Sequence, residues 1–416
     1  MIPPTHKSVS LQGIPSMYPT GSFLAIGIVD VGGIARSGNS VGYDIYTIDY
    51  FGDMDVKSFS KKSLSVIDEY GHRKEDKTVL SEKLLKLVKK LINENKIDFV
   101  LLSSGLDDDF DFLYNLNELI PIMGNDPGVF KAVRDKENFF QSLKQIGLLF
   151  PRTCIVKNFY EGLHAARDIG FPIILKPLSG FGGLGVKKIV DKKELKKFFK
   201  MELKEPYLVQ EYISGIPASI SLLADGTRTQ ILTINEQLLG MREFGQSEEF
   251  VYCGNVIPFD TSDEKKKECE KIASRITDHF RLKGSNGIDI VFSNQKEEIY
   301  VIEVNPRFQG TLECSEKFLN LNLINLHEKA CLNRELKKHY NPPGSIFYTR
   351  AILYAKNNLI APDLSNYDFV RDVPHPGFKI NRGEPICSIL SCSMDREKCL
   401  EKVELLAENI YNKKIG

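Results

Sequence analysis

The stretch that decides the fold is Ile299-Tyr300-Val301-Ile302-Glu303-Val304-Asn305-Pro306-Arg307-Phe308-Gln309. It begins as an apolar run of strand length and ends in a carboxylate, a carboxamide and a guanidinium. Because side chains alternate between the faces of a strand, Glu303, Asn305 and Arg307 are predicted to share one face. Ile302 and Val304 are then expected to point into the core. Carboxylate and amide oxygens suit Mg²⁺ held against nucleotide phosphates, and a guanidinium suits an anionic oxygen that develops during a reaction.

A second acidic strand lies just upstream, Gly287-Ile288-Asp289-Ile290-Val291-Phe292, and residues 293–298 form a short polar connection. Two strands joined in this way predict a hairpin that places Asp289 opposite Glu303. One carboxylate from each strand then faces the same metal ion, with Asn305 as a further ligand. The alternative is that Asp289 merely ends a strand and that Glu303 pairs with Arg307 or a surface lysine. Apolar strands seldom carry acids without a reason, which favours the metal site.

A glycine-rich segment supplies the other half of a phosphate site. The predicted strand 170–177 contains Lys176, and four glycines follow between positions 180 and 185, namely Gly180, Gly182, Gly183 and Gly185. Glycine permits the close backbone approach that lets amides cradle phosphate oxygens. Here the lysine precedes the glycines and another strand, 186–190, follows them, unlike in a P-loop. The pattern predicts a flap over a nucleotide; the alternative is a flexible surface turn.

The N-terminal third alternates predicted strands with helical segments. The first 21 residues are expected to be an irregular arm rich in Pro and Ser. Strands are predicted at 23–29, 43–49 and 99–105, with an amphipathic helix at 80–95. This order indicates a parallel, doubly wound sheet. The Gly32-Gly33 turn, with Asp49 at the end of the second strand, suggests a dinucleotide-binding site as an alternative. The G-x-G-x-x-G pattern of such sites is absent.

Composition limits the partners and the location. The chain has 416 residues, enough for two or three domains, with 55 Lys and Arg against 55 Asp and Glu. A net charge of zero gives no electrostatic case for nucleic acid or a membrane surface as partner. No apolar run is long enough to span a bilayer, and the N-terminus lacks a secretory core, so a cytoplasmic protein is predicted. The eight cysteines form no C-x-x-C pair, which argues against structural zinc.

The pieces together resemble the ATP-grasp superfamily. The resemblance covers residues 20–330 and rests on elements that follow in this order: Arg134-Asp135-Lys136 opening a helix, Leu175-Lys176-Pro177 with the glycine flap, Val209-Gln210-Glu211-Tyr212, Gly287-Ile288-Asp289, and Glu303-Val304-Asn305-Pro306-Arg307. Within the superfamily the chain looks most similar to archaeal carboligases related to biotin carboxylase. Its tail, with Asp372 to Gly377 and Gly383 to Ser388, is similar to their small C-terminal domain.

The resemblance implies an α/β ATP-grasp fold between two further domains. A Rossmann-like domain is expected at 22–128, the ATP-grasp domain with its flap 178–186 at 129–332, and a small α+β domain at 333–416. It also implies ATP and Mg²⁺ (or Mn²⁺) as cofactors, small carboxylate and amine substrates, and leaves a homodimer open.

The resemblance assigns roles residue by residue. Lys136, Lys176 and the flap glycines would contact ATP phosphates. Gln210, Glu211 and Ile213 would hold adenine and ribose, with Ser219 near the ribose. Asp289, Glu303 and Asn305 would bind the metal. Arg307 would stabilise an acyl phosphate or tetrahedral intermediate, with Gln309 beside it, and Lys176 and Asn305 would join it in catalysis. Asp at position 289, where the carboxylases carry Glu, weakens the case for bicarbonate chemistry.

The expected activity is ligation of a carboxylate to an amine through an acyl phosphate, with release of ADP and phosphate. Two alternatives stay open. Carboxylation with bicarbonate has little support, because no Met-Lys-Met carrier is present and Gly310-Thr311-Leu312-Glu313 follows Gln309 where a carboxylase would carry a Val-Glu-His string. A non-catalytic ATP sensor would be expected to have lost some of Lys176, Glu303, Asn305 and Arg307, and all are present. The loop 248–255 is a further candidate for contact with the acceptor.

Overall fold

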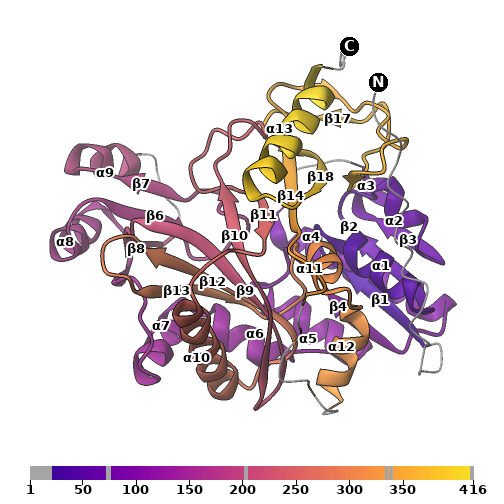
Figure 1. Ribbon diagram of the computed structural model, residues 1–416, viewed down its shortest axis with the longest axis horizontal. Helices are drawn as coiled ribbons and strands as arrows, with labels where there is room; N and C mark the ends of the chain where they lie inside the picture. The colour runs from indigo at the N-terminus through magenta and orange to yellow at the C-terminus, as the bar shows by residue number, and fades with distance from the viewer. Residues whose placement is uncertain are drawn as a thin grey trace.

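The computed structural model describes residues 21–71, 76–200, 205–332, 336, 340 and 342–412. Of the predicted N-terminal arm, only Gly21 lies within the described residues. Three sheet-based regions surround a common centre, with the first sheet at one side and helices α8 (Phe159–Ile169) and α9 (Lys192–Phe199) at the other (Figure 1). Among the described helices, none combines the length and apolarity needed to cross a membrane. The predicted cytoplasmic location stays a prediction.

The first region is a four-stranded parallel sheet in the order β3-β2-β1-β4. Its strands are β1 (Ser22–Ile26), β2 (Asp44–Asp49), β3 (Lys62–Ser65) and β4 (Phe99–Leu102). Its helices are α1 (Val31–Ser40), α2 (Met54–Lys57), α3 (Val66–Tyr70), α4 (Lys77–Glu94) and α5 (Phe110–Leu119). Phe23 packs in one core with Ile34 of α1, and Leu24 packs in another with Leu84 of α4. Both faces are covered, which confirms the doubly wound sheet.

The second region is a four-stranded antiparallel sheet in the order β5-β8-β6-β7. It comprises β5 (Thr153–Val156), β6 (Ile173–Pro177), β7 (Lys187–Ile189) and β8 (Tyr207–Glu211), with α8 (Phe159–Ile169) and α9 (Lys192–Phe199). Ala166 of α8 and Leu195 of α9 share one core with Ile173 and Val209 of the sheet. The predicted strand, glycine turn and strand are confirmed as the β6–β7 hairpin.

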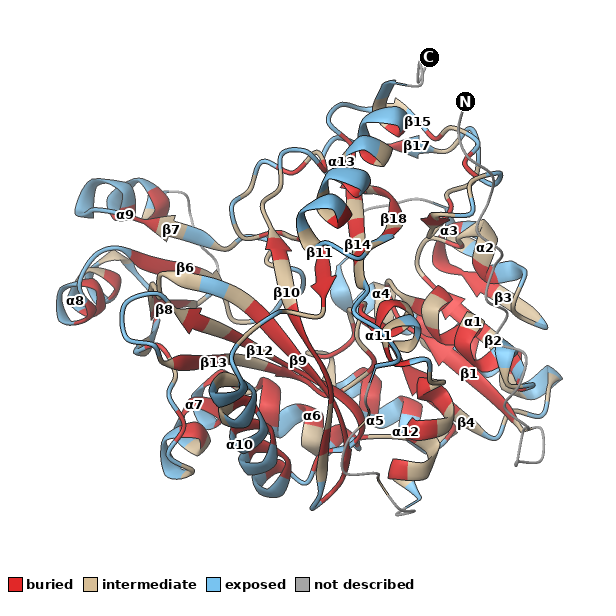
Figure 2. Cartoon of the chain, viewed as in Figure 1, coloured by how far each residue is buried: buried red, intermediate tan, exposed pale blue. Residues whose placement is uncertain are grey.

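The third region is an eight-stranded sheet in the order β13-β12-β9-β10-β11-β14-β18-β16. Its first five strands are β9 (Gly215–Asp225), β10 (Thr229–Leu239), β11 (Tyr252–Ile257), β12 (Lys283–Ser293) and β13 (Ile299–Asn305). Helices α6 (Pro127–Arg134), α7 (Lys136–Gln145) and α10 (Asp263–Phe280) contribute to a core with β9, β12 and β13. These strands are largely buried (Figure 2). The predicted β12–β13 hairpin is confirmed.

The C-terminal segment continues the same sheet. It provides β14 (Phe347–Tyr354), β16 (Val370–Arg371) and β18 (Pro385–Ser393), together with α13 (Arg396–Asn412) and the small pair β15 (Leu359–Ile360) and β17 (Lys379–Ile380). Helices α11 (Leu312–Leu319) and α12 (Leu323–Cys331) pack in one core with the first sheet. The domain boundaries at 128 and 332 stay predictions; helix α6 crosses the first of them.

Candidate active site

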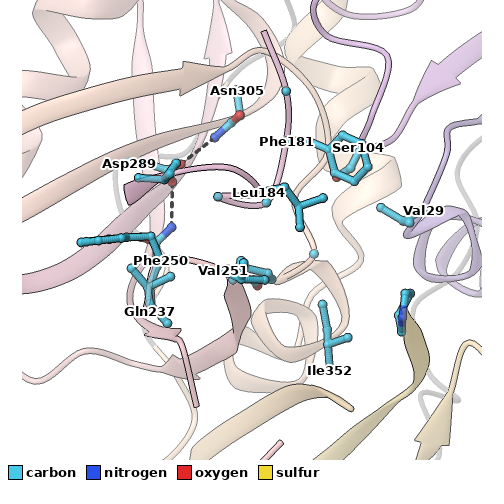
Figure 3. A pocket seen from close by; sticks show the side chains of 18 of the residues that line it. Val29, Ser104, Phe181, Leu184, Gln237, Phe250, Val251, Asp289, Asn305 and Ile352 are labelled. Atoms are coloured by element: carbon cyan, nitrogen blue, oxygen red, sulfur yellow. Dashed lines mark hydrogen bonds between the residues drawn. The ribbon is translucent and has the colours of Figure 1, made fainter. Parts of the chain in front are cut away.

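Asp289 and Glu303 face each other across two strands. The antiparallel register of β12 and β13 pairs Asp289 with Glu303 directly, as the hairpin predicted. Asp289 accepts hydrogen bonds from two side-chain amides, Gln237 Nε2 at 2.9 Å and Asn305 Nδ2 at 3.1 Å (Figure 3). Burial, reinforced by the nearby charge of Glu303, raises the pKa of Asp289.

The prediction that Ile302 points into the core is wrong. The register of the hairpin shifts between Asp289 and Ile290, so that Ile302 is an extra residue on β13. Such a bulge turns two successive side chains towards one face. Ile302 therefore lines the same cavity as Glu303, while Val301 and Val304 are fully buried on the core side.

Glu303 is surrounded by cations. Lys136 Nζ lies 3.2 Å from its Oε2, and Arg134 Nη1 lies 3.4 Å from its Oε1. Burial opposes ionisation of Glu303, but Arg134, Lys136 and Lys176 together lower its pKa well below its ordinary value. The alternative that Glu303 pairs with Arg307 or a surface lysine is wrong, because both of its partners are buried. Burial and the charge of Lys136 lower the pKa of Lys176 to about 8.

The chemistry of these donors fits a hard divalent cation completed by a ligand. Asp289 and Glu303 offer carboxylate oxygens, and Asn305 offers a carboxamide. Within the described ranges, no group of three or more His, Cys, Asp or Glu side chains is placed to hold a metal by itself. Mg²⁺ is commonly held by one or two carboxylates plus substrate phosphates. The donor set therefore suits a metal that arrives with a nucleotide.

Arg307 is fixed by a residue of the first region. Its Nε donates to Asp107 Oδ1 at 3.1 Å, and its Nη1 donates to the carbonyl of Phe308 at 2.9 Å. Gln309 folds back, and its Nε2 donates to the carbonyl of Asn305 at 3.2 Å. A guanidinium held in this way needs little reorganisation when negative charge develops beside it.

The neighbouring acid, Asp108, holds a second arginine and the flap. Arg134 Nε donates to Asp108 Oδ1 at 2.5 Å. The amide of Gly180 donates to Asp108 Oδ2 at 2.9 Å, and Arg134 Nη2 donates to the carbonyl of Gly180 at 3.2 Å. Asp108 and Arg134 together therefore hydrogen-bond the backbone N–H and C=O of Gly180. Arg134 also forms an ion pair with Glu303.

The flap has the backbone that its sequence demands. Gly182, Gly183 and Gly185 have φ of 62°, 75° and 77°, which favour glycine. A Cβ on Gly183 would lie 1.9 Å from the carbonyl oxygen of Phe250, and the amide of Tyr252 donates to the carbonyl of Gly182 at 2.9 Å. The flap is therefore docked on residues 250–252, within the loop that the sequence had suggested for the acceptor.

The predicted adenine residues lie on β8 and just beyond it. Gln210 is buried and donates to Thr153 Oγ1 at 3.1 Å, while Glu211 accepts from Arg152 Nε at 3.2 Å. Ile213 lines the same cavity. Ser219 pairs with Asp289 in the β9–β12 register, so it lies with the acids and away from this hinge. Their contacts with nucleotide stay predictions.

These residues line one cavity of about 720 Å³ between the three regions. Its volume is in the range typical of ligand sites, roughly 300–1,000 Å³. All the predicted site residues except Gly185 line it; among them are Lys136, Lys176, Asp289, Glu303 and Arg307. Gly185 lies beside it, where an added Cβ would be 3.2 Å from Pro177.

Comparison with known proteins agrees with this architecture. Residues 133–311 match the family model of the ATP-grasp domain. The protein contains an ATP-grasp domain. An uncharacterised protein of Methanocaldococcus jannaschii is 29% identical over 370 residues, covering 86% of this chain and 85% of that protein. The C-terminal section of the carbamoyl phosphate synthase large chain of Methanopyrus kandleri is 27% identical over 233 residues, 54% of this chain and 42% of its own.

Solved structures show the same fold over nearly the whole chain. Biotin carboxylase of Campylobacter jejuni superposes with a TM-score of 0.71 and 15% identity, covering 93% of this chain and 90% of its own. The L-amino acid ligase of Bacillus licheniformis gives 0.68 and 15%, covering 94% and 97%. The α/β ATP-grasp fold is thereby confirmed, including the parts that flank the ATP-grasp domain.

Four residues of the candidate site were given no role by sequence reasoning: Asp107, Asp108, Arg134 and Gln237. A signal existed for the two acids, because they follow β4 at the carboxyl edge of a parallel sheet, where ligand sites gather. Arg134 stands next to a predicted site residue, Lys136, but nothing local shows that its side chain turns towards Glu303. Gln237 sits on an ordinary strand, and only the β10–β9–β12 pairing brings it to Asp289.

Proposed function

We propose that the protein is an ATP-dependent ligase that joins a carboxylic acid to an amine. The observation that carries the proposal is the opposed pair Asp289 and Glu303, with Lys136 and Lys176 nearby and Arg307 in the same cavity under a glycine flap. Two acids suit a divalent metal, two ammonium groups suit phosphates, and a fixed guanidinium suits a developing oxyanion.

The reaction would proceed in two steps. A carboxylate oxygen of the acid attacks the γ-phosphorus of ATP, forming an acyl phosphate and releasing ADP. The amine then attacks the acyl carbon, and phosphate leaves as the amide bond forms and the amine loses a proton. Lys136 and Lys176 would orient the phosphates, and Arg307 would stabilise the acyl phosphate. Mg²⁺ bound by Asp289, Glu303 and Asn305 would neutralise phosphate charge. Catalysis then consists mainly of positioning and charge stabilisation.

Closure of the flap serves this chemistry because water hydrolyses an acyl phosphate. The flap contacts residues 250–252 on one side and the Asp108–Arg134 pair on the other. A docked flap excludes water from the reacting groups.

Carboxylation with bicarbonate is the weaker candidate. The first acid after Gln309 in the sequence is Glu313, and both of its oxygens accept from Arg371, at 2.8 and 2.9 Å. Its pKa is held at about 2, because burial is outweighed by Arg371 and Arg36. A carboxylate tied in this way is a poor base.

The deciding experiment is a screen for ADP release from MgATP with pooled carboxylic acids, with and without pooled amines, and with bicarbonate alone. Release that needs both an acid and an amine supports the ligase. Release that needs bicarbonate instead favours carboxylation. Tight ATP binding without turnover in any pool favours a sensor and contradicts the proposal.

A further inference from the structure

The cavity extends beyond the residues assigned to ATP and metal, into a lobe lined by apolar side chains. The flap contributes Phe181 and Leu184, the first region contributes Val29, and β14 contributes Ile352. Figure 3 shows these four side chains around one open space, with Val251 at its edge. Phe181 is 41% exposed and Leu184 is 52% exposed, so the tip of a docked flap carries two large apolar groups that the protein itself leaves uncovered.

Apolar side chains of this size on a phosphate-covering flap call for an explanation, because amides and glycine suffice to bind phosphate. Burying apolar surface against a ligand is favourable roughly in proportion to the area removed from water. Phe181 and Leu184 are therefore well placed to close over an apolar part of a substrate.

The charged groups on the far wall of this lobe offer little to a polar ligand. Arg350 pairs with Asp30 at 2.7 Å and with Asp372 at 2.6 Å, so its guanidinium is already occupied by two carboxylates of the protein. Burial raises the pKa of Asp53 well above its ordinary value, which favours its neutral form. Apolar contact is then the main source of affinity that the lobe can provide.

The lobe is also connected to the reacting groups. Asp107 holds Arg307, and the next residue, Asp108, holds Gly180 of the flap, whose neighbour is Phe181. Arg307 would bind the carboxylate of the acid. Asp107 and Asp108, which are consecutive in the chain, therefore connect Arg307 to the apolar tip of the flap.

We propose that the acid substrate carries an apolar or aromatic group, with its carboxylate at Arg307 and its apolar group between Phe181, Leu184, Val29 and Ile352. This inference rests on the proposed ligase function and specifies the substrate class of that site. It predicts that affinity rises with the apolar size of the acid and depends on the two flap side chains.

The test measures binding of two probe acids, 3-phenylpropionate and propionate, to the full-length protein in the presence of MgADP by calorimetry. We expect 3-phenylpropionate to bind at least tenfold more tightly. Phe181→Ala and Leu184→Ser should each remove most of that difference. MgADP affinity is measured in the same variants, so that lost acid binding is distinguished from lost nucleotide binding. Val190→Ser, which alters an exposed residue just beyond β7 and outside the cavity lining, is the matched control and should retain the difference between the two acids.

Equal affinity for the two acids, no binding of either, or unchanged affinity in both flap variants would overturn the inference. ADP release separates this outcome from failure of the ligase function. Turnover that needs an amine but accepts only small or polar acids keeps the ligase and removes the apolar site. Tight binding of 3-phenylpropionate without turnover with any amine keeps the apolar site and removes the ligase.

Discussion

The two walls of the cavity are built in opposite ways. The acids stand on β12 and β13, whose register is set by a hairpin and whose other face is buried in the core. The flap is exposed glycine backbone held by a few hydrogen bonds, from Asp108, Arg134 and the amide of Tyr252. We propose that the first wall, called the rigid wall below, fixes charge, and that the flap, called the movable wall, controls access of water and substrate.

Breaking the rigid wall should have the largest effect. Glu303→Gln removes the charge that faces Lys136 and Arg134 and one proposed metal oxygen. We expect MgATP turnover to fall by about 10²–10³-fold, the scale seen when one preorganised electrostatic group is lost. Nucleotide binding without metal should persist, because the cations remain. Full metal-dependent turnover in this variant would falsify the site assignment.

Docking of the flap can be disrupted by adding a single methyl group at Gly183. In Gly183→Ala the new Cβ would overlap the carbonyl oxygen of Phe250, so the flap cannot dock as it does here. We expect turnover to drop roughly tenfold to a hundredfold, since small misplacements are costly, with little change in thermal stability. Gly182→Ala is the control: it also has a positive φ of 62°, but nothing lies within 4 Å of its added Cβ. Equal losses in the two variants would point to backbone strain in place of docking.

A milder change tests the link between the walls. Asp108→Asn keeps an oxygen acceptor for the Gly180 amide but removes the negative charge that pairs with Arg134. We expect a fluorescent ADP analogue to dissociate about tenfold faster, because such a charge-assisted hydrogen bond contributes about 1.5–3 kcal/mol. Asp111→Asn changes an exposed residue of α5 and serves as control. An unchanged dissociation rate would mean that the Asp108–Arg134 pair does not govern the flap.

The smallest effect on activity is expected from changing His327, which supports β12 of the rigid wall from outside the cavity lining. The effect on stability should be clear. Buried His327 accepts the Ser285 amide of β12 at Nδ1, 2.8 Å away, and Nε2 lies 2.9 Å from the carbonyl of Met123. Burial lowers its pKa from 6.5 to about 4, although the bond to Met123 opposes this shift. The unfolded chain therefore binds more protons between these pH values, so stability is full above pH 6.5 and is lost as pH falls through 4.

The expected loss is about 3 kcal/mol of unfolding free energy. Urea unfolding of the wild type and of His327→Asn at pH 4 to 7 measures it. The variant should be less stable at pH 7 but should lack this component of the pH dependence. An identical pH slope in both proteins would contradict the assignment.

Much of the acidic wall was predictable because it depends on local sequence. An apolar run ending in Glu303 predicted a strand, and the short polar connection predicted the hairpin and the pairing with Asp289. The bulge at Ile302 was not predictable, because an extra residue in one strand follows from how β12 and β13 pair and not from the apolar pattern of either. The partners of Glu303 were partly missed for the same reason, since Arg134 reaches it from the end of a different helix.

The chain by itself determined the strands, the glycine flap and the residue types that suit metal, phosphate and oxyanion, because periodicity and glycine conformations are properties of short segments. Only the tertiary structure decided which side chains meet. Asp107 and Asp108 reach Arg307 and the flap because the first sheet packs against the others, and Phe181 and Leu184 face Val29 and Ile352 for the same reason. Contacts between distant segments depend on the packing of whole elements, which no single stretch of sequence encodes.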